Sequence, residues 1–369
     1  MTRTKTKNKY YSLDKILEYN ATYNMVVGER SNGKTYAVMK YAIDDYFNGS
    51  GGELALVRRW DEDIRPNKAN QMFNAHIENG VIEELSEGEY TGVTYTAGKF
   101  YFCNYDEDDG RPIFNDNDVF GYTFAVSQGE HYKSLSYPNI NTILFDEFMT
   151  KGTTLKDEFT LFMNIVSTIV RRRDNVKIFM LGNTVNKYSP YFKEMGLTNM
   201  SDMIQGTIDL YTYGDSELSV AVEYPKSNGE SKPSDKYFAF DNPKLKMITS
   251  GAWELDIYPH LPVKYVPKEV ELTYFIKFDD SVFQCEIIEA EGELFTYIHE
   301  KTTPIKNENE DIVYSLEYSH RHNYSRSIYK STHRFGKIIA SFFHTDKVFY
   351  QDNHVGNAIS NYLELASKL

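Results

Sequence analysis

The segment GERSNGKT, residues 28–35, constrains the fold of this chain more than any other part of the sequence. It follows an apolar run, YNMVV at 23–27, which predicts a buried strand, and it precedes a helical pattern from Lys34 to about Phe47. It matches G-x-x-x-x-G-K-[ST] in full, in the strand-to-helix setting that the motif requires. There, backbone N–H groups and the positive end of the helix dipole bind phosphate. The sequence therefore predicts a nucleotide phosphate site in an α/β sheet.

The chemistry of this loop predicts ATP and Mg²⁺ as its ligands. Lys34 is expected to bridge the β- and γ-phosphates, and Thr35 to offer its hydroxyl to Mg²⁺. An ordinary glycine-containing turn is the alternative. The residues that we expect to contact the nucleotide are Gly28, Glu29, Arg30, Ser31, Asn32, Gly33, Lys34 and Thr35.

A second segment, TILFDEF at 142–148, supplies the acidic residues that a phosphate loop needs. Apolar residues precede Asp146 and Glu147, so both carboxylates should emerge at the carboxyl end of a buried strand, where α/β proteins bind ligands. Asp146 is a candidate Mg²⁺ ligand, and Glu147 is placed to polarise the attacking water. Asn183 ends a later apolar run and is a candidate for orienting that water or sensing the γ-phosphate. The alternatives are two solvated acids and a turn-forming asparagine.

The apolar pattern around these segments predicts a doubly wound α/β fold. The runs Thr142–Phe145 and Val176–Leu181 lack polar alternation, as do central parallel strands that are covered on both faces. Between them, apolar residues recur at three- and four-residue steps from Leu155 to Ile169, which predicts one amphipathic helix. Strands therefore alternate with helices through about residue 215.

Less regular elements are expected between residues 60 and 120. The pattern predicts a helix at about 67–85 and a hairpin from 92–96 and 99–103. The stretch 104–118 holds six acids and one Arg, and we interpret it as a solvated loop. A metal site there is the alternative.

Two arginine clusters follow predicted elements. Arg58 and Arg59 end a strand and are expected to face phosphate, DNA or a neighbouring subunit, with solvation as the default for at least one of them. Arg171, Arg172 and Arg173 follow the amphipathic helix. They either offset the dipole at the helix C-terminus or include an arginine finger, which stabilises charge on the γ-phosphate in a neighbouring subunit.

The composition changes beyond the predicted α/β region. PKSNGESKPSDK, at 225–236, is linker-like, and from Glu271 short strands separated by turns predict an α+β domain with a helical end. We therefore expect a phosphate-loop domain at 1–215, a linker region at 216–260 and a smaller α+β domain at 261–369.

Charge and cysteine content narrow the functional classes. The chain has 40 Lys and Arg against 53 Asp and Glu, a net charge of −13, so nucleic acid can be held only by local patches. One such patch is 321–337, which has five Lys or Arg and no acid and is either a phosphate-binding surface or a basic helix face.

The distant Cys103 and Cys285 indicate neither a disulfide framework nor a zinc site and fit a reducing cytoplasm. The sequence contains no run of ~18 apolar residues, so it predicts no membrane span.

Taken together, the segments VVGERSNGKT, LALVRRW, YPNINTILFDEF, VRRRDNVKIFMLGN and YSPYF resemble the DNA-encapsidation ATPases of small short-tailed phages with protein-primed linear genomes. The resemblance is clearest over residues 10–195. It implies a terminase-like P-loop ATPase domain of the ASCE type, with a central mainly parallel sheet. It also implies a ring, a pentamer, that sits at the portal vertex of an empty capsid and drives double-stranded DNA inward.

The resemblance further implies partners, a location and residue roles. The partners are double-stranded DNA, the portal or procapsid, and a phage-encoded structural RNA, for which 321–337 is the candidate contact. The location is the host bacterial cytoplasm, transiently at the portal vertex. Asp61 departs from the pattern, because relatives carry there a lysine that acts in trans. The implied roles are Lys34 and Thr35 as the phosphate-loop pair, Asp146 as Mg²⁺ ligand, Glu147 as catalytic glutamate, Arg171 as finger with Arg173 as backup, and Asn183 as sensor.

The second domain resembles a degenerate version of the ribonuclease-H-like nuclease that follows the motor in larger terminases. Asp279 and Asp280 fall in a turn, and Glu286 and Glu289 do not obviously converge with them, whereas a two-metal nuclease needs clustered carboxylates. We therefore expect no cleavage. Two alternatives stay open: a terminase with an active C-terminal nuclease, and an ATP-controlled structural assembly protein with little turnover.

Overall fold

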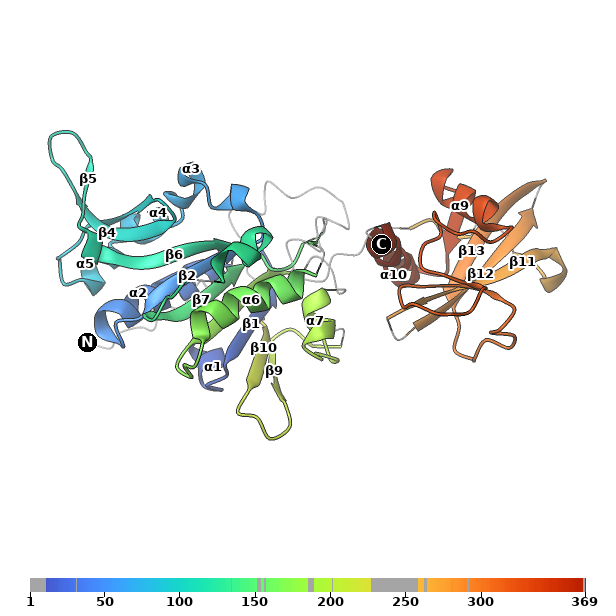
Figure 1. Cartoon of the computed structure of the whole chain (residues 1–369), viewed down its shortest axis with the longest axis horizontal. Helices are drawn as coiled ribbons and strands as arrows, with labels where there is room; N and C mark the ends of the chain where they lie inside the picture. Colours follow the sequence, from blue (N-terminus) through green and yellow to red (C-terminus); the bar gives the residue numbers. More distant parts are fainter. Residues whose placement is uncertain are drawn as a thin grey trace, which may run out of the picture. The chain divides into compact units, whose positions relative to one another are not determined.

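The computed structural model describes residues 11–369 except 31, 134, 151–153, 156, 185–188, 201, 227–257, 262–263, 280, 291 and 368. The chain divides into two compact units, Met1–Glu254 and Leu255–Leu369 (Figure 1). Among the residues so described, no helix is long and apolar enough to cross a membrane.

A large, mostly parallel sheet forms the centre of the first unit. Its strand order is β3-β4-β6-β2-β7-β8-β1-β10-β9, with β5 paired to β4. The run from β6 to β10 is parallel throughout, and antiparallel partners flank it at both ends. The strands are β1 (Tyr23–Gly28), β2 (Glu53–Arg58), β3 (Gly92–Thr96), β4 (Lys99–Tyr105), β5 (Pro112–Ile113), β6 (Val119–Ala125), β7 (Ile140–Asp146), β8 (Lys177–Asn183), β9 (Thr207–Thr212) and β10 (Ser219–Tyr224).

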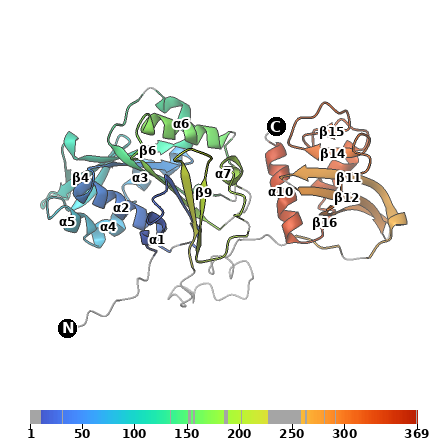
Figure 2. The ribbon, with the colours of Figure 1, turned by 90° about the horizontal axis from the view of Figure 1, so that it is seen from below.

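Helices cover both faces of this sheet, which explains the unbroken apolar runs of its central strands. One core joins strand residues such as Phe145 to Phe162 of α6, and the other joins residues such as Leu144 to Val38 of α2. Figure 2 shows α6 and α7 on one side of the sheet and α1, α2 and α4 on the other. The helices are α1 (Asp14–Leu17), α2 (Lys34–Asn48), α3 (Pro66–Ala69), α4 (Asn74–Glu78), α5 (Val81–Leu85), α6 (Glu158–Val170) and α7 (Pro190–Glu194).

These elements confirm the expected doubly wound α/β class and the hairpin of β3 and β4. The helix expected at 67–85 is instead three short helices, α3 to α5, and Gly80 precedes the last of them with φ +70°. A left-handed residue cannot continue a right-handed helix, so the segment breaks there.

The domain boundary expected at residue 215 lies inside the first unit. β9 and β10 form a hairpin across it, and β10 pairs in parallel with β1, the strand that leads into the phosphate loop. Val220, Ala221 and Val222 are fully buried in β10, so the region expected as linker from 216 begins with core strand. The linker-like stretch 225–236 lies mostly outside the described residues.

The second unit is a six-stranded sheet with two longer helices. Its order is β15-β14-β11-β12-β13-β16, in which β12 runs antiparallel to β11 and β13 and the other pairs are parallel. Strands β11, β12 and β13 are the consecutive short strands that the sequence predicts from Glu271. Its elements are β11 (Val270–Phe278), β12 (Ser281–Ala290), β13 (Glu293–Glu300), β14 (Ile312–Ser315), β15 (Tyr324–Ser325), α9 (Gly336–His344), β16 (Val348–Tyr350) and α10 (Asn353–Ser367).

Candidate nucleotide-binding site

Four neighbouring parallel strands end at one edge of the first sheet and carry the candidate residues. In sheet order they are β2, β7, β8 and β1, which end at Arg58, Asp146, Asn183 and Gly28. Their carboxyl ends therefore meet, although the residues lie up to about 150 positions apart in the chain.

The phosphate loop connects the end of β1 to the first turn of α2. Gly33, at the N-cap of α2, has φ 91°, a left-handed conformation that glycine adopts without steric cost. Lys34 is buried, and its ammonium donates to the carbonyl of Glu29 at 2.6 Å and to Asn183 Oδ1 at 3.5 Å. The loop thus folds around its own lysine. Ser31, another residue of this loop, lies outside the described residues.

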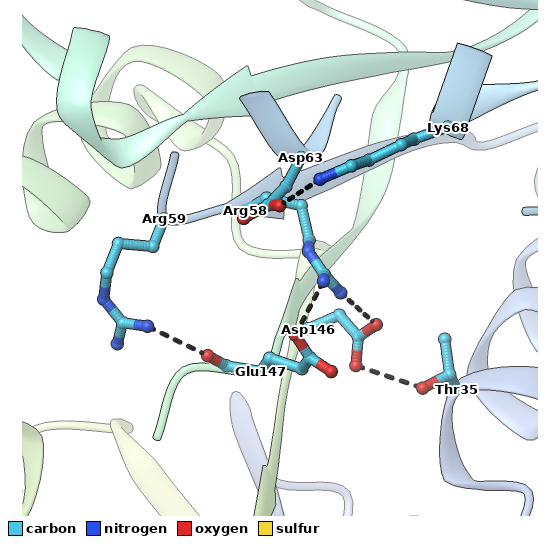
Figure 3. A network of polar contacts seen from close by, with 7 residues as sticks. All are labelled: Thr35, Arg58, Arg59, Asp63, Lys68, Asp146 and Glu147. Atoms are coloured by element: carbon cyan, nitrogen blue, oxygen red, sulfur yellow. Dashed lines mark hydrogen bonds and ion pairs between the residues drawn. The ribbon is translucent and has the colours of Figure 1, made fainter. Parts of the chain in front are cut away.

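Asp146 lies between the phosphate loop and β2. Thr35 donates its hydroxyl to Asp146 Oδ1 at 3.0 Å, and Arg58 donates to Oδ2 at 2.7 Å (Figure 3). Burial raises the pKa of Asp146 above its usual range, and the positive charge of Arg58 is the largest opposing influence. A hydroxyl oxygen beside a carboxylate is a pair of oxygen ligands that suits Mg²⁺, so these residues fit the predicted metal role.

Glu147 is the next residue along the chain and is more exposed. Its side chain is 60% accessible, and Oε2 accepts from Arg58 at 2.7 Å. Its backbone has φ 58°, a left-handed conformation that is uncommon for a residue with a side chain. Arg58 therefore bridges both carboxylates, in a contact that the sequence analysis did not predict.

Most of the predicted residues line one cavity of about 630 Å³, which is large enough for a nucleotide, whereas Gly28 and Glu29 do not line it. Asn183 lines it from the end of β8, and Gly182 before it has no room for a side chain because an added Cβ would lie 2.7 Å from Met149 Sδ. The lining residues are Arg30, Asn32, Gly33, Lys34, Thr35, Tyr36, Asp146, Glu147, Met149, Thr150, Leu181, Gly182 and Asn183.

Arg59 corrects the expectation that at least one of the two β2 arginines is solvated. It is only 6% exposed and forms an ion pair with Glu158, which is 2% exposed. Arg58 is 15% exposed at its side chain. Sequence analysis had no local signal for these contacts, because the partners of both arginines lie about 90 to 100 residues away.

The arginine triplet lies at the opposite end of the parallel strands from the cavity. It follows α6, which starts after β7 near the cavity and runs back to the start of that strand. Arg171 is exposed, and its guanidinium donates to the carbonyl of Leu135 at 2.5 Å. Arg173 is half-buried and donates to the carbonyls of Ile140 and Ile169. Arg173 thus anchors the start of β7, and within one chain neither arginine faces the cavity.

The two charged stretches have more structure than expected. The acidic stretch 104–118 contains β5, which pairs with the end of β4, and a 3₁₀ turn at Asp116–Asp118. The basic stretch 321–337 contains β15 and then irregular backbone before α9, so it is not one helix face. Arg321 in it pairs with Glu308 at 3.6 Å.

The remaining described candidates are not among the residues that line the cavity. Asp61 begins an exposed 3₁₀ turn and does not line the cavity. In the second unit Glu286 accepts from Tyr265 and from Gln284, while Asp280 lies outside the described residues. Within the described part of the chain, no group of three His, Cys, Asp or Glu is arranged to hold a metal ion.

The fold and the cavity define an α/β protein whose phosphate-loop motif lies at the carboxyl edge of a parallel sheet, beside an Asp-Glu pair. The chain belongs to the podovirus DNA encapsidation protein (Gp16) family, whose sequence model matches residues 5–236. This confirms the resemblance stated from the motifs.

Relatives among known proteins agree with this membership. The DNA packaging protein of Bacillus phage phi29 is 28% identical over 189 residues, which are 50% of each chain. That of Bacillus phage B103 is 27% identical over 185 residues, 49% of this chain and 50% of the relative. The matches thus span about half the length of these relatives.

Solved structures show the same fold over nearly the whole chain. A chain of the bacteriophage Phi-29 viral genome packaging motor assembly has a TM-score of 0.58 at 20% identity, covering 97% of this chain and 100% of that one. A chain of the Phi-28 gp11 DNA packaging motor has a TM-score of 0.56 at 20% identity, covering 98% of both.

Proposed function

We propose that this protein is an ATP hydrolase that drives double-stranded DNA into a preformed phage capsid as part of a ring, which we take to be a pentamer. The observation that carries the proposal is the meeting of Lys34, Asp146, Glu147 and Asn183 around one cavity, because these are the groups that a P-loop ATPase needs. Family membership supports the packaging role. The motor would act in the host cytoplasm and transiently at the portal vertex.

In this mechanism each residue has one task. Lys34 and the backbone N–H groups of the loop hold the phosphates, and Thr35 and Asp146 hold Mg²⁺. The metal, when bound, neutralises charge on the β- and γ-phosphates. Glu147 orients the attacking water, and Asn183, which also contacts Lys34, senses the γ-phosphate.

Arg58 adds a requirement to this scheme. It donates to Asp146 and to Glu147 Oε2, so the other carboxylate oxygen of Glu147, Oε1, must be the one that accepts from water while this contact holds.

Arg171 would complete the site of a neighbouring subunit as the finger. Its exposure and its distance from the cavity of its own chain suit a role in trans. Mixing Arg171→Ala subunits with Lys34→Ala subunits should restore hydrolysis only where intact interfaces form. Normal hydrolysis by Arg171→Ala alone would exclude the trans role.

The RNA contact remains our proposal for the stretch 321–337. Lys330 and Lys337 are exposed there, and Tyr329, which precedes Lys330, is 41% exposed although its ring packs against His344. We expect Lys330→Ala with Lys337→Ala to weaken binding of structured RNA by about tenfold, as phosphate contacts are lost. Lys264→Ala with Lys268→Ala is the matched control, and equal weakening by both pairs would exclude this site.

The decisive experiment measures ATP turnover with and without double-stranded DNA. Glu147→Gln should retain ATP binding and lose turnover by a factor of about 100 or more, whereas an ATP-controlled assembly protein would be nearly unchanged. Glu83→Gln, an exposed acid on α5, is the matched control. Packaging of DNA into purified capsids by the wild type but not by Glu147→Gln then tests translocation.

A further inference from the structure

A buried ion pair lies behind the candidate site and has no place in the mechanism above. Arg59 donates through Nε to Glu158 Oε2 at 2.9 Å and through Nη2 to Oε1 at 3.0 Å. Tyr191 donates to the same Oε1 at 3.0 Å, and the N–H of Leu155 to Oε2 at 2.8 Å. Each carboxylate oxygen thus has two donors, so the buried charges are fully compensated.

Arg59 also donates hydrogen bonds to the main chain at and next to the predicted catalytic glutamate. Nη1 donates to the carbonyl of Glu147 at 3.3 Å, and Nη2 to that of Phe148 at 2.5 Å (Figure 3 shows the first contact). Glu147 is the residue with φ 58°. A left-handed conformation is unfavourable for a non-glycine residue and persists only where its surroundings hold it.

Arg58 at the end of β2 and its neighbour Arg59 therefore contact different parts of the same residue. Arg58, the last residue of β2, reaches the carboxylates, while Arg59, the residue after the strand, reaches the backbone behind them. Arg59 does not line the cavity, and neither does Glu158. Arg59 can therefore act on hydrolysis only indirectly, and its contacts with the main chain of the Asp-Glu segment are those to the Glu147 and Phe148 carbonyls.

We propose that Arg59, held by Glu158 and Tyr191, is a positioning residue that fixes the backbone of Glu147 so that its carboxylate is aimed at the attacking water. The proposal rests on the proposed ATP hydrolysis. A lysine at this position keeps the charge but cannot form the two-pronged bond to Glu158 and reach two carbonyls as well.

The test measures ATP affinity, kcat and thermal unfolding of the full chain. We expect Arg59→Lys to lower kcat by about tenfold to hundredfold, with ATP affinity within about twofold of the wild type. In a Glu147→Gln background, Arg59→Lys should cause no further loss, because the residue it positions is already inactive. A fall in residual hydrolysis as large in that background as in the wild type would overturn the proposal, as would an unchanged kcat.

A second pair of variants serves if Arg59→Lys does not fold. Tyr191→Phe removes one hydrogen bond from Glu158 and should lower kcat a few-fold. Tyr23→Phe, which removes a buried hydroxyl from the same core, is the matched control and should not lower kcat. Equal effects of both would overturn the proposal. A wild type that binds ATP without hydrolysing it would instead refute the proposed function.

Discussion

At the scale of single residues, the site depends on arginines whose roles differ although they are neighbours in sequence. Arg58 contacts two carboxylates at the cavity, and Arg59 is buried behind it. The same division appears after α6, where Arg171 is exposed and Arg173 bonds to the backbone of the sheet. Burial and contacts, rather than sequence position, thus distinguish the arginines within each cluster.

Arg173→Ala should destabilise the protein. It removes hydrogen bonds to Ile140, Ile169 and Asn141 Oδ1, so we expect the free energy of unfolding to fall by about 1–3 kcal/mol. Arg171→Ala should change it by about 0.5 kcal/mol or less, since that side chain is exposed. Denaturant unfolding measures both, and a larger loss for Arg171→Ala would contradict this assignment.

At the scale of elements, the β9–β10 hairpin determines where the first unit can be truncated. β10 covers the edge of β1, whose six residues are all buried. Removing it would expose a long apolar strand edge, which is a template for aggregation.

Two fragments test this boundary. A fragment that ends at Glu254 should stay soluble, whereas one that ends at Asp215 lacks β10 and should aggregate. Size-exclusion chromatography distinguishes them. A monodisperse fragment ending at Asp215 would show that β10 is dispensable.

A cross-strand cluster on β12 and β13 predicts a pH dependence of stability. The pKa of Glu286 is lowered to about 2, first by His299 and then by the hydroxyl of Tyr265 and the amide of Gln284. Conversely, hydrogen bonding to Glu286 is the main cause that raises the pKa of His299 above 6.5.

The two shifts act in different pH windows. The contribution of Glu286 is present above its ordinary pKa of 4.5 and is lost as the pH falls towards about 2. That of His299 is complete below 6.5 and is lost as the pH rises through its raised pKa. Unfolding of the full chain by urea across pH should therefore show a decline on the alkaline side that His299→Gln removes. A decline that persists in His299→Gln would exclude this pair as its cause.

At the scale of the whole molecule, the net charge of −13 restricts how the proposed DNA substrate could be bound. Contacts must come from local clusters of Lys and Arg, which bind phosphates and release counterions. A motor that must release and regrip DNA suits such limited contact better than a strong global field would.

The rate of DNA-stimulated hydrolysis should therefore depend steeply on salt. Between about 50 and 200 mM salt we expect the apparent affinity for double-stranded DNA to fall by about tenfold or more, with little dependence on sequence. Hydrolysis without DNA serves as the control and should change little. A salt-independent affinity would rule out phosphate contact as the main interaction.

The sequence alone was sufficient for features that depend on neighbouring residues. A phosphate loop needs its glycines, lysine and threonine in one short segment, and a buried strand that ends in Asp146 and Glu147 is visible as an apolar run. Only the tertiary structure could place β10 beside β1, pair Arg59 with Glu158 and let Arg58 bridge the two carboxylates. The physical reason is that sheet order and burial bring together residues distant in the chain, and no local pattern of side chains encodes which strands become neighbours.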